Sequence, residues 1–418
     1  MTTHQRKRRE PTLPSRDGPP AALALDQIFA HTAGSHPNRV AIQDGWHRLT
    51  YAQADRQAVR LASALVRGGV QLGDPLVVRC ENHRQGLVAQ LAVLKAGGVC
   101  VPAPHGPGGT AAAVRATGAR AVLCSRSTYD PAVNGAPSLA LDDPATWRKI
   151  ASVPVEAALS RSSAEGGAHL LLDRDGRERL IDHRSWLRSA ADRSRRAGVP
   201  GGTVTIDQEP ASPAALAAMW WAYSCGAMLH TAPWDQDPGW PLTGARDSVT
   251  VLTPEEYADR LDAGPPPERR TVRTAGGPGT VVLIGGPCTR RLVSRHFAAR
   301  PGTRLWSEFA PTDGAVPWTA QELFARDGGR PHEPGAGSSV PPLRLRVAGA
   351  GGESLPQGAV GSIVATGPPW WPEDVQYSGW RGCWTPDHTL DLTGRAARGP
   401  GREDRPAAPA ARPDMEVT

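Results

Sequence analysis

The chain has 418 residues, of which 47 are basic and 41 acidic, giving a formal net charge of +6. It contains only three lysines, Lys7, Lys95 and Lys149, so nearly every basic residue is an arginine. This composition excludes a Walker-type lysine loop, a Schiff-base lysine or another catalytic ammonium group after residue 149. Glycine and proline make up about a fifth of the chain, which indicates many loops but not wholesale disorder.

Half of the positive surplus lies in residues 1–22, a polar segment without periodicity that we expect to be a disordered basic tail. The rest is spread too thinly over the chain for a nucleic-acid footprint. Weak nucleic-acid binding through the run from Arg6 to Arg9 is an alternative hypothesis, although such runs are usually solvated tails.

The sequence has none of the usual signals for export or metal binding. The N-terminus lacks the apolar stretch of a secretory signal, and the longest apolar run, residues 214–229, is too short to span a bilayer. The six cysteines include no CxxC pair, and the twelve histidines form no HExxH motif. We therefore expect a soluble cytoplasmic protein with scattered thiols.

Periodicity predicts alternating helices and short buried strands from residue 23 onward. Thr50 can cap a helix with apolar residues at three- and four-residue spacing, and a second helix is expected over 86–95. Strands are expected at 75–79, 99–102, 121–124, 168–172, 280–284, 343–347 and 361–365. The pattern predicts an α/β fold with helix-covered, largely parallel sheets, followed by a small β-rich subdomain over about 340–395.

The order of several motifs resembles the adenylation domains of nonribosomal peptide synthetases, which belong to the adenylate-forming, AMP-binding superfamily. The resemblance covers residues 23–395. It implies the large N-terminal domain of the adenylate-forming fold, with a small distorted β-barrel subdomain. The motifs that carry it are residues 49–51 (LTY), 94–102 (LKAGGVCVP), 282–286 (VLIGG), 309–313 (FAPTD), 356–361 (PQGAVG) and 386–395 (PDHTLDLTGR).

The phosphate-binding loop of this family has no counterpart here. The family places a glycine-rich, lysine-containing loop between a strand and a histidine, which corresponds to His183. Residues 173–182 (DRDGRERLID) contain one glycine, no lysine and no serine or threonine. Their arginines could attract phosphate, but the neighbouring carboxylates oppose them, so we favour a tight solvated hairpin.

The resemblance implies a vestigial nucleotide site with altered ribose recognition. Thr312 and Asp313 stand at the phosphate-contacting and magnesium-binding positions, although this segment could be only a turn of the fold. Trp380 replaces the aspartate that binds the ribose, and indole has no acceptor. Trp380 could stack on a base, but we expect it to plug the site. The implied nucleotide-binding residues are Gly285, Gly286, Phe309, Thr312, Ser378 and Arg395, with Asp313 as the metal ligand.

The substrate pocket also departs from the family pattern. The position of the aspartate that holds an amino group falls on Pro213, and Asp207 reaches it only if an insertion is assumed. Glu308 could pair with an amine, although glutamate is usually solvated. The pocket positions implied by the resemblance are Leu283, Gly285, Glu308, Val316 and Pro317.

The family continues with a mobile, lysine-bearing C-terminal subdomain. Here residues 396–418 are rich in Ala, Pro and Arg, so we expect a disordered tail and no mobile subdomain.

These features favour a degenerate, non-catalytic homologue that acts as a binding or scaffolding partner in nonribosomal peptide or related biosynthesis. Possible partners are a carrier protein, a synthetase module or an MbtH-like protein, and adjacent Trp370 and Trp371 suggest a partner surface. We expect that the protein uses no cofactor. If the site still functions, we expect it to bind ATP and Mg²⁺. The alternative is an active amino-acid or acyl adenylating enzyme completed in trans, favoured by the retention of Thr312, Asp313 and Arg395.

Overall fold

The computed structural model describes residues 23–103, 106, 108–172, 178–198, 202–231, 248–263, 279–312, 314–341, 343–367 and 375–396. The basic tail, residues 173–177, Asp313, Trp370, Trp371 and residues 397–418 lie outside them. The helices are α1 (Leu25–Ser35), α2 (Tyr51–Arg67), α3 (His83–Lys95), α4 (Gly109–Thr117), α5 (Pro144–Ser152), α6 (His183–Ala197), α7 (Pro213–Ser224), α8 (Pro254–Ala263), α9 (Arg290–Ala299) and α10 (Ala325–Gly328).

The larger of two mixed sheets has nine strands in the order β16-β15-β14-β13-β12-β10-β11-β1-β2. Its strands from β14 to β1 are parallel, and antiparallel strands close both edges. The strands are β1 (Val40–Asp44), β2 (His47–Thr50), β10 (Thr203–Ile206), β11 (Met228–Thr231), β12 (Val249–Leu252), β13 (Thr280–Gly285), β14 (Arg304–Phe309), β15 (Thr319–Leu323) and β16 (Ser338–Ser339).

The second mixed sheet has seven strands in the order β6-β7-β5-β3-β4-β8-β9. Its central strands β7, β5, β3, β4 and β8 are parallel, as predicted for helix-covered strands. The strands are β3 (Pro75–Arg79), β4 (Val99–Pro102), β5 (Ala121–Cys124), β6 (Ala132–Val133), β7 (Ala136–Ala140), β8 (Gly167–Leu172) and β9 (Glu178–Asp182), and a short 3-10 helix spans Arg126–Thr128.

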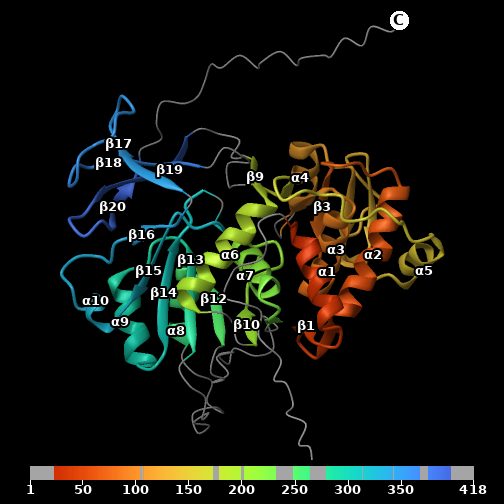
Figure 1. Ribbon diagram of the computed structural model, residues 1–418, viewed down its shortest axis with the longest axis horizontal. Helices are drawn as coiled ribbons and strands as arrows, with labels where there is room; N and C mark the ends of the chain where they lie inside the picture. The colour runs from red at the N-terminus through yellow and green to blue at the C-terminus, as the bar shows by residue number, and fades with distance from the viewer. Residues whose placement is uncertain are drawn as a thin grey trace, which may run out of the picture.

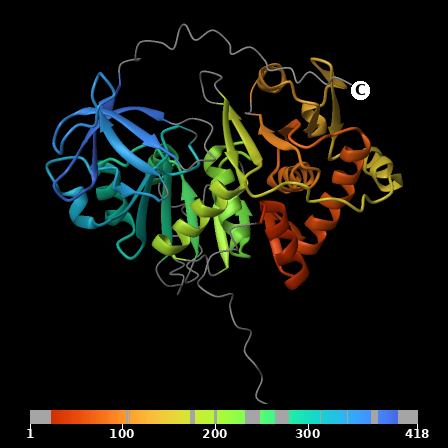
Figure 2. The same cartoon turned by 45° about the horizontal axis from the view of Figure 1, so that its top comes forward.

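A four-stranded antiparallel sheet follows, in the order β17-β18-β19-β20. In Figure 2 it lies over one end of the nine-stranded sheet. A shared core joins the two, because Phe309 and Trp318 pack with Val347, Ile363 and Leu390. The strands are β17 (Arg344–Ala348), β18 (Gly361–Thr366), β19 (Gln376–Trp384) and β20 (Leu390–Arg395).

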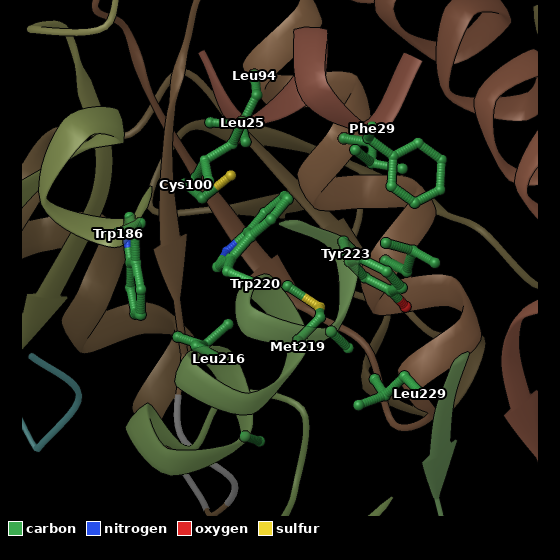
Figure 3. Packing of buried hydrophobic residues seen from close by; sticks show 14 of the residues in the cluster. Leu25, Phe29, Leu94, Cys100, Trp186, Leu216, Met219, Trp220, Tyr223 and Leu229 are labelled. Atoms are coloured by element: carbon green, nitrogen blue, oxygen red, sulfur yellow. The ribbon is translucent and has the colours of Figure 1, made fainter. Parts of the chain in front are cut away.

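The main hydrophobic core lies between the two large sheets, where α6 and α7 are found (Figure 1). Helix α7 is apolar all round, and Trp220 and Tyr223 are buried with Phe29 and Trp186 from other helices (Figure 3). Helices α8 and α9 cover the outer face of the nine-stranded sheet, and α4 covers the outer face of the other. No helix in the described ranges is both long and apolar enough to cross a membrane.

The predicted helix after Thr50 is confirmed, and so is its cap. The Thr50 Oγ1 atom accepts a hydrogen bond from the backbone N–H of Gln53 at 3.2 Å, and the Gln53 Oε1 atom accepts one from the Thr50 N–H at 2.9 Å. This reciprocal capping box satisfies two backbone donors at the start of α2. The predicted helix over 86–95 begins three residues earlier, at His83, where the Asn82 side chain provides the cap.

Replacing Thr50 with alanine should lower the free energy of unfolding by about 1 kcal/mol, because an N-cap acceptor is lost. Urea denaturation at a fixed temperature measures this change. Thr50→Ser keeps the hydroxyl group and should stay close to the unmodified chain. Equal stability of Thr50→Ala and Thr50→Ser would show that the cap contributes nothing.

Candidate functional site

The predicted glycine pair and Phe309 meet at the carboxyl ends of two neighbouring parallel strands. Gly285 of β13 pairs in register with Phe309 of β14, and the Ala310 N–H donates to the Gly285 carbonyl at 2.9 Å. Gly285 has a φ of +111°, and a Cβ built on it would meet no atom within 4 Å. A Cβ built on Gly286 would lie 3.8 Å from the Glu255 Oε1 atom, which is an ordinary contact distance. Open space therefore remains in front of these strand ends, where α/β sheets commonly bind ligands.

Trp380 packs against two of the predicted nucleotide-binding residues, Phe309 and Arg395. Its ring meets that of Phe309 edge-on, with centroids 5.8 Å apart and an interplanar angle of 82°. The Arg395 Cζ atom lies over the indole at 5.1 Å, a cation–π distance. Trp380 is therefore in contact with both Phe309 and Arg395.

The pairing of β19 with β18 is irregular just before Trp380, and the hydroxyl group of Ser378 forms a local hydrogen bond there. The Trp380 N–H donates to the Ser378 Oγ atom at 3.0 Å, across Gly379, which has a φ of +73°. Ser378 is buried. Its hydroxyl group therefore stabilises the irregular part of β19 that carries Trp380.

A buried ion pair joins Arg193 of α6 and Glu308 of β14. The Arg193 Nε atom donates to the Glu308 Oε2 atom at 2.8 Å and to Oε1 at 3.1 Å, and Nη2 donates to the Ala315 carbonyl at 2.7 Å. Arg193 is 1 % exposed and Glu308 is 4 % exposed. Burial raises the pKa of Glu308, and the guanidinium opposes that rise.

The implied pocket residues do not all lie on one face. Val282 and Ile284 point from β13 into the core that contains α6 and α7, whereas Leu283 packs under α8 and α9. Leu283 therefore does not line a pocket with Glu308, because alternate residues of a strand face opposite sides. Val316 packs against the core on the Glu308 side, and Pro317 is buried.

Two positions were considered for an amine-binding aspartate, Pro213 and Asp207. The structure gives each of them another role. Pro213 begins α7 and lies close to Gly314, whose added Cβ would be 3.2 Å from the Pro213 Cβ atom. Asp207 follows β10, is buried, and forms an ion pair with Arg260 of α8. Asp207 and Glu308 are therefore each already neutralised by an arginine.

The remaining predicted positions are His183, Thr312 and Asp313, and Asp313 lies outside the described residues. His183 begins α6, is fully buried, and its Nδ1 atom accepts from the Leu25 N–H at 3.1 Å. Burial lowers its pKa to about 4, so the ring is neutral. Thr312 is described and half-buried next to Asp313, which is not described. Within the described residues, no group of His, Cys, Asp and Glu side chains is placed to hold a metal ion.

Sequence reasoning missed Arg193, although α6 carries a usable signal. Arg193 follows the buried residues Trp186 and Ala190 at helical spacing, so it falls on the apolar face of the helix. An arginine at such a position is almost never buried unless it has an acidic partner. The position of Arg193 thus predicts an acidic side chain close to it but does not identify that residue as Glu308.

Comparisons with known proteins agree with this architecture. A family model described as AMP-binding enzyme matches residues 29–156. Phosphinothricin tripeptide synthetase PhsB from Streptomyces viridochromogenes is 29 % identical over 379 residues, which cover 84 % of this chain and 30 % of the synthetase. The chain thus spans about a third of the length of this curated relative.

Solved structures show the same fold at lower sequence identity. The nonribosomal peptide synthetase FmoA3 superposes with a TM-score of 0.77 and 21 % identity, covering 91 % of this chain and 43 % of FmoA3. The N-terminal subdomain of NpsA from Klebsiella oxytoca, in complex with 3-hydroxybenzoyl-AMSN, gives a TM-score of 0.71 at 18 % identity and covers 89 % of this chain. All of that subdomain is matched. The expected N-terminal adenylate-forming fold is therefore confirmed.

Arg193→Met should lower the free energy of unfolding by about 3–5 kcal/mol, because it leaves the Glu308 carboxylate buried without its partner. The double variant Arg193→Met/Glu308→Leu removes both charges and should recover most of this loss. Urea denaturation of the variants and the unmodified chain measures the difference. If Arg193→Met lowered the free energy of unfolding by less than about 1 kcal/mol, the ion pair would contribute no more than a solvent-exposed pair does.

The Arg193→Met variant should also become less stable as the pH rises. Burial raises the Glu308 pKa above its unfolded value, so the folded state binds the proton more tightly than the unfolded state. The protonated carboxyl group favours folding at acidic pH, and that advantage is lost as the pH rises through the folded pKa. Urea midpoints measured from acidic to neutral pH should fall more in Arg193→Met than in the double variant, which lacks this carboxyl group.

Proposed function

The chain is similar to adenylation domains and has the N-terminal adenylate-forming fold. We propose that, unlike an adenylating enzyme, it acts without catalysis. Its role would be that of a binding or scaffolding partner in nonribosomal peptide or related specialised-metabolite biosynthesis. A carrier protein or a synthetase module is the partner that this proposal favours, with an MbtH-like protein as a further candidate.

The contact of Trp380 with Phe309 and Arg395 is the observation that carries this proposal. A nucleotide at this position would need an acceptor for its ribose hydroxyl groups, and an indole supplies only a donor. It would also have to separate the aromatic ring and the guanidinium from Trp380. Two residues expected to contact the nucleotide, Phe309 and Arg395, are thus each in contact with Trp380.

Two further features support a loss of catalysis. Asp207 and Glu308 are paired with Arg260 and Arg193, so neither is available to hold the amino group of an amino acid without breaking a buried ion pair. The sequence of residues 173–182 also lacks the lysine and the glycines with which the family surrounds phosphate. Adenylation needs strong stabilisation of the charge on the phosphate during transfer.

An adenylating activity is the alternative, and the open space in front of Gly285 favours it. That activity would require Trp380 to move, or would place the ribose away from it. Exchange of labelled pyrophosphate into ATP with a panel of amino, aryl and aliphatic acids distinguishes the two functions. Exchange above background with any of these acids would contradict the non-catalytic proposal.

Calorimetric titration with ATP and Mg²⁺ should show no saturable binding to the unmodified chain. Adenosine tests the role of Trp380 alone, because adenosine has no phosphate groups and its binding does not need a phosphate loop. Trp380→Ala should gain weak adenosine binding, since the indole no longer fills the space between Phe309 and Arg395. Trp384→Ala removes a tryptophan from the same strand outside this contact and should gain none.

Saturable binding of ATP and Mg²⁺ by the unmodified chain would overturn the proposal. If Trp380→Ala bound adenosine no better than Trp384→Ala, the indole would not be the obstacle.

A further inference from the structure

A second concave surface lies on the seven-stranded sheet, at the edge farther from β8 and β9. It is a groove of about 1000 Å³ between the ends of α2 and α4, the strands β5 and β7, and α5. Its lining contains none of the residues of the candidate site described above. We call it the α2–α5 groove, and it is independent of the proposed function.

The floor of the α2–α5 groove is apolar. Leu65 contributes from α2, Val70 from the segment after α2, Ala121 from β5, and Ile150 from α5. All four are buried members of the main core, so the floor is continuous with the packed interior. Such a surface favours an apolar ligand face over water.

The rim of the groove is strongly basic. Arg115 and Arg120 line it from α4 and the start of β5, Lys149 lines it from α5, and Arg126 lies beyond the end of β5. Asp143 is the acidic residue among the lining residues. The walls therefore attract an anionic partner.

Two of these cations, Arg115 and Lys149, have no acidic partner among the described residues. Arg120 lies 3.6 Å from Asp74, and Arg126 lies 2.9 Å from Asp143. Arg115 and Lys149 form no ion pair with any other described residue, and Lys149 is exposed. In addition, the buried Oγ atom of Ser138, on the β7 wall, has no hydrogen-bond partner among the described residues.

We propose that the α2–α5 groove binds an acidic amphipathic α-helix of a partner protein. An apolar stripe of such a helix would lie on the floor, and carboxylates on its flanks would meet Arg115 on one wall and Lys149 on the other. A purely apolar helix would leave these cations unpaired. A nucleic acid would match the charge but would leave the apolar floor uncovered.

A designed peptide tests the proposal on the full chain. A fluorescein-labelled helix of about 18 residues, or five turns, carries leucine along one face and glutamate elsewhere. A matched peptide has glutamine in place of every glutamate. Fluorescence anisotropy should show that the glutamate peptide binds more tightly than the glutamine peptide, and that this binding weakens as salt is added.

Charge reversal locates the binding. Arg115→Glu/Lys149→Glu should weaken binding of the glutamate peptide about tenfold or more. The control Arg56→Glu/Arg60→Glu changes the same net charge on the exposed face of α2, outside the groove, and should have a much smaller effect. Thermal unfolding midpoints show whether both variants are folded, and Arg115→Gln/Lys149→Gln replaces the first variant if it is not.

Three results would overturn the proposal. One is equal binding of the glutamate and glutamine peptides, which would indicate an apolar groove without charge selection. Another is equal weakening by the groove variant and the α2 control. The third is full displacement of the peptide by a short DNA duplex at matched charge concentration, which would indicate an unselective cationic surface.

Discussion

The guanidinium of Arg193 and the carboxylate of Glu308 lie in the interior between α6 and β14, where each is tolerated only because the other is present. The pair links α6 to β14. Through the hydrogen bond from Arg193 to the Ala315 carbonyl, it also holds the loop that follows Phe309. Phe309, the residue after Glu308 in β14, packs with residues of the small β-sheet.

The same kind of arrangement recurs across the candidate site, where charged and aromatic side chains are paired with one another. Arg260 neutralises Asp207, and Arg193 neutralises Glu308. Trp380 contacts both Phe309 and Arg395. Planar guanidinium groups suit such sites because they stay charged when buried and also stack on aromatic rings. A chain with 47 basic residues and only three lysines has many groups of this kind.

Local spacing was enough to predict much of the fold. Thr50 and the apolar repeat behind it specify α2, and short runs such as residues 121–124 specify buried parallel strands. Contacts between distant residues could not be predicted in the same way. Arg193 and Glu308 meet because α6 packs on the strand ends, and the face of Leu283 depends on how β13 enters the sheet. The indole of Trp380 was expected to plug the site, but its contact with Phe309 required the placement of the small sheet.

Because lysine is scarce in this chain, the amine of Lys149 can report on the solvent access of the α2–α5 groove. The ammonium group of Lys95 is buried and lies 2.9 Å from a carboxylate oxygen of Asp55, which shields it from reagents. Lys149 is exposed on the wall of the groove, and Lys7 lies far away in the sequence. Amine-reactive footprinting read by peptide mass spectrometry therefore follows the solvent access of one wall of this groove, with the Lys7 peptide as an internal reference.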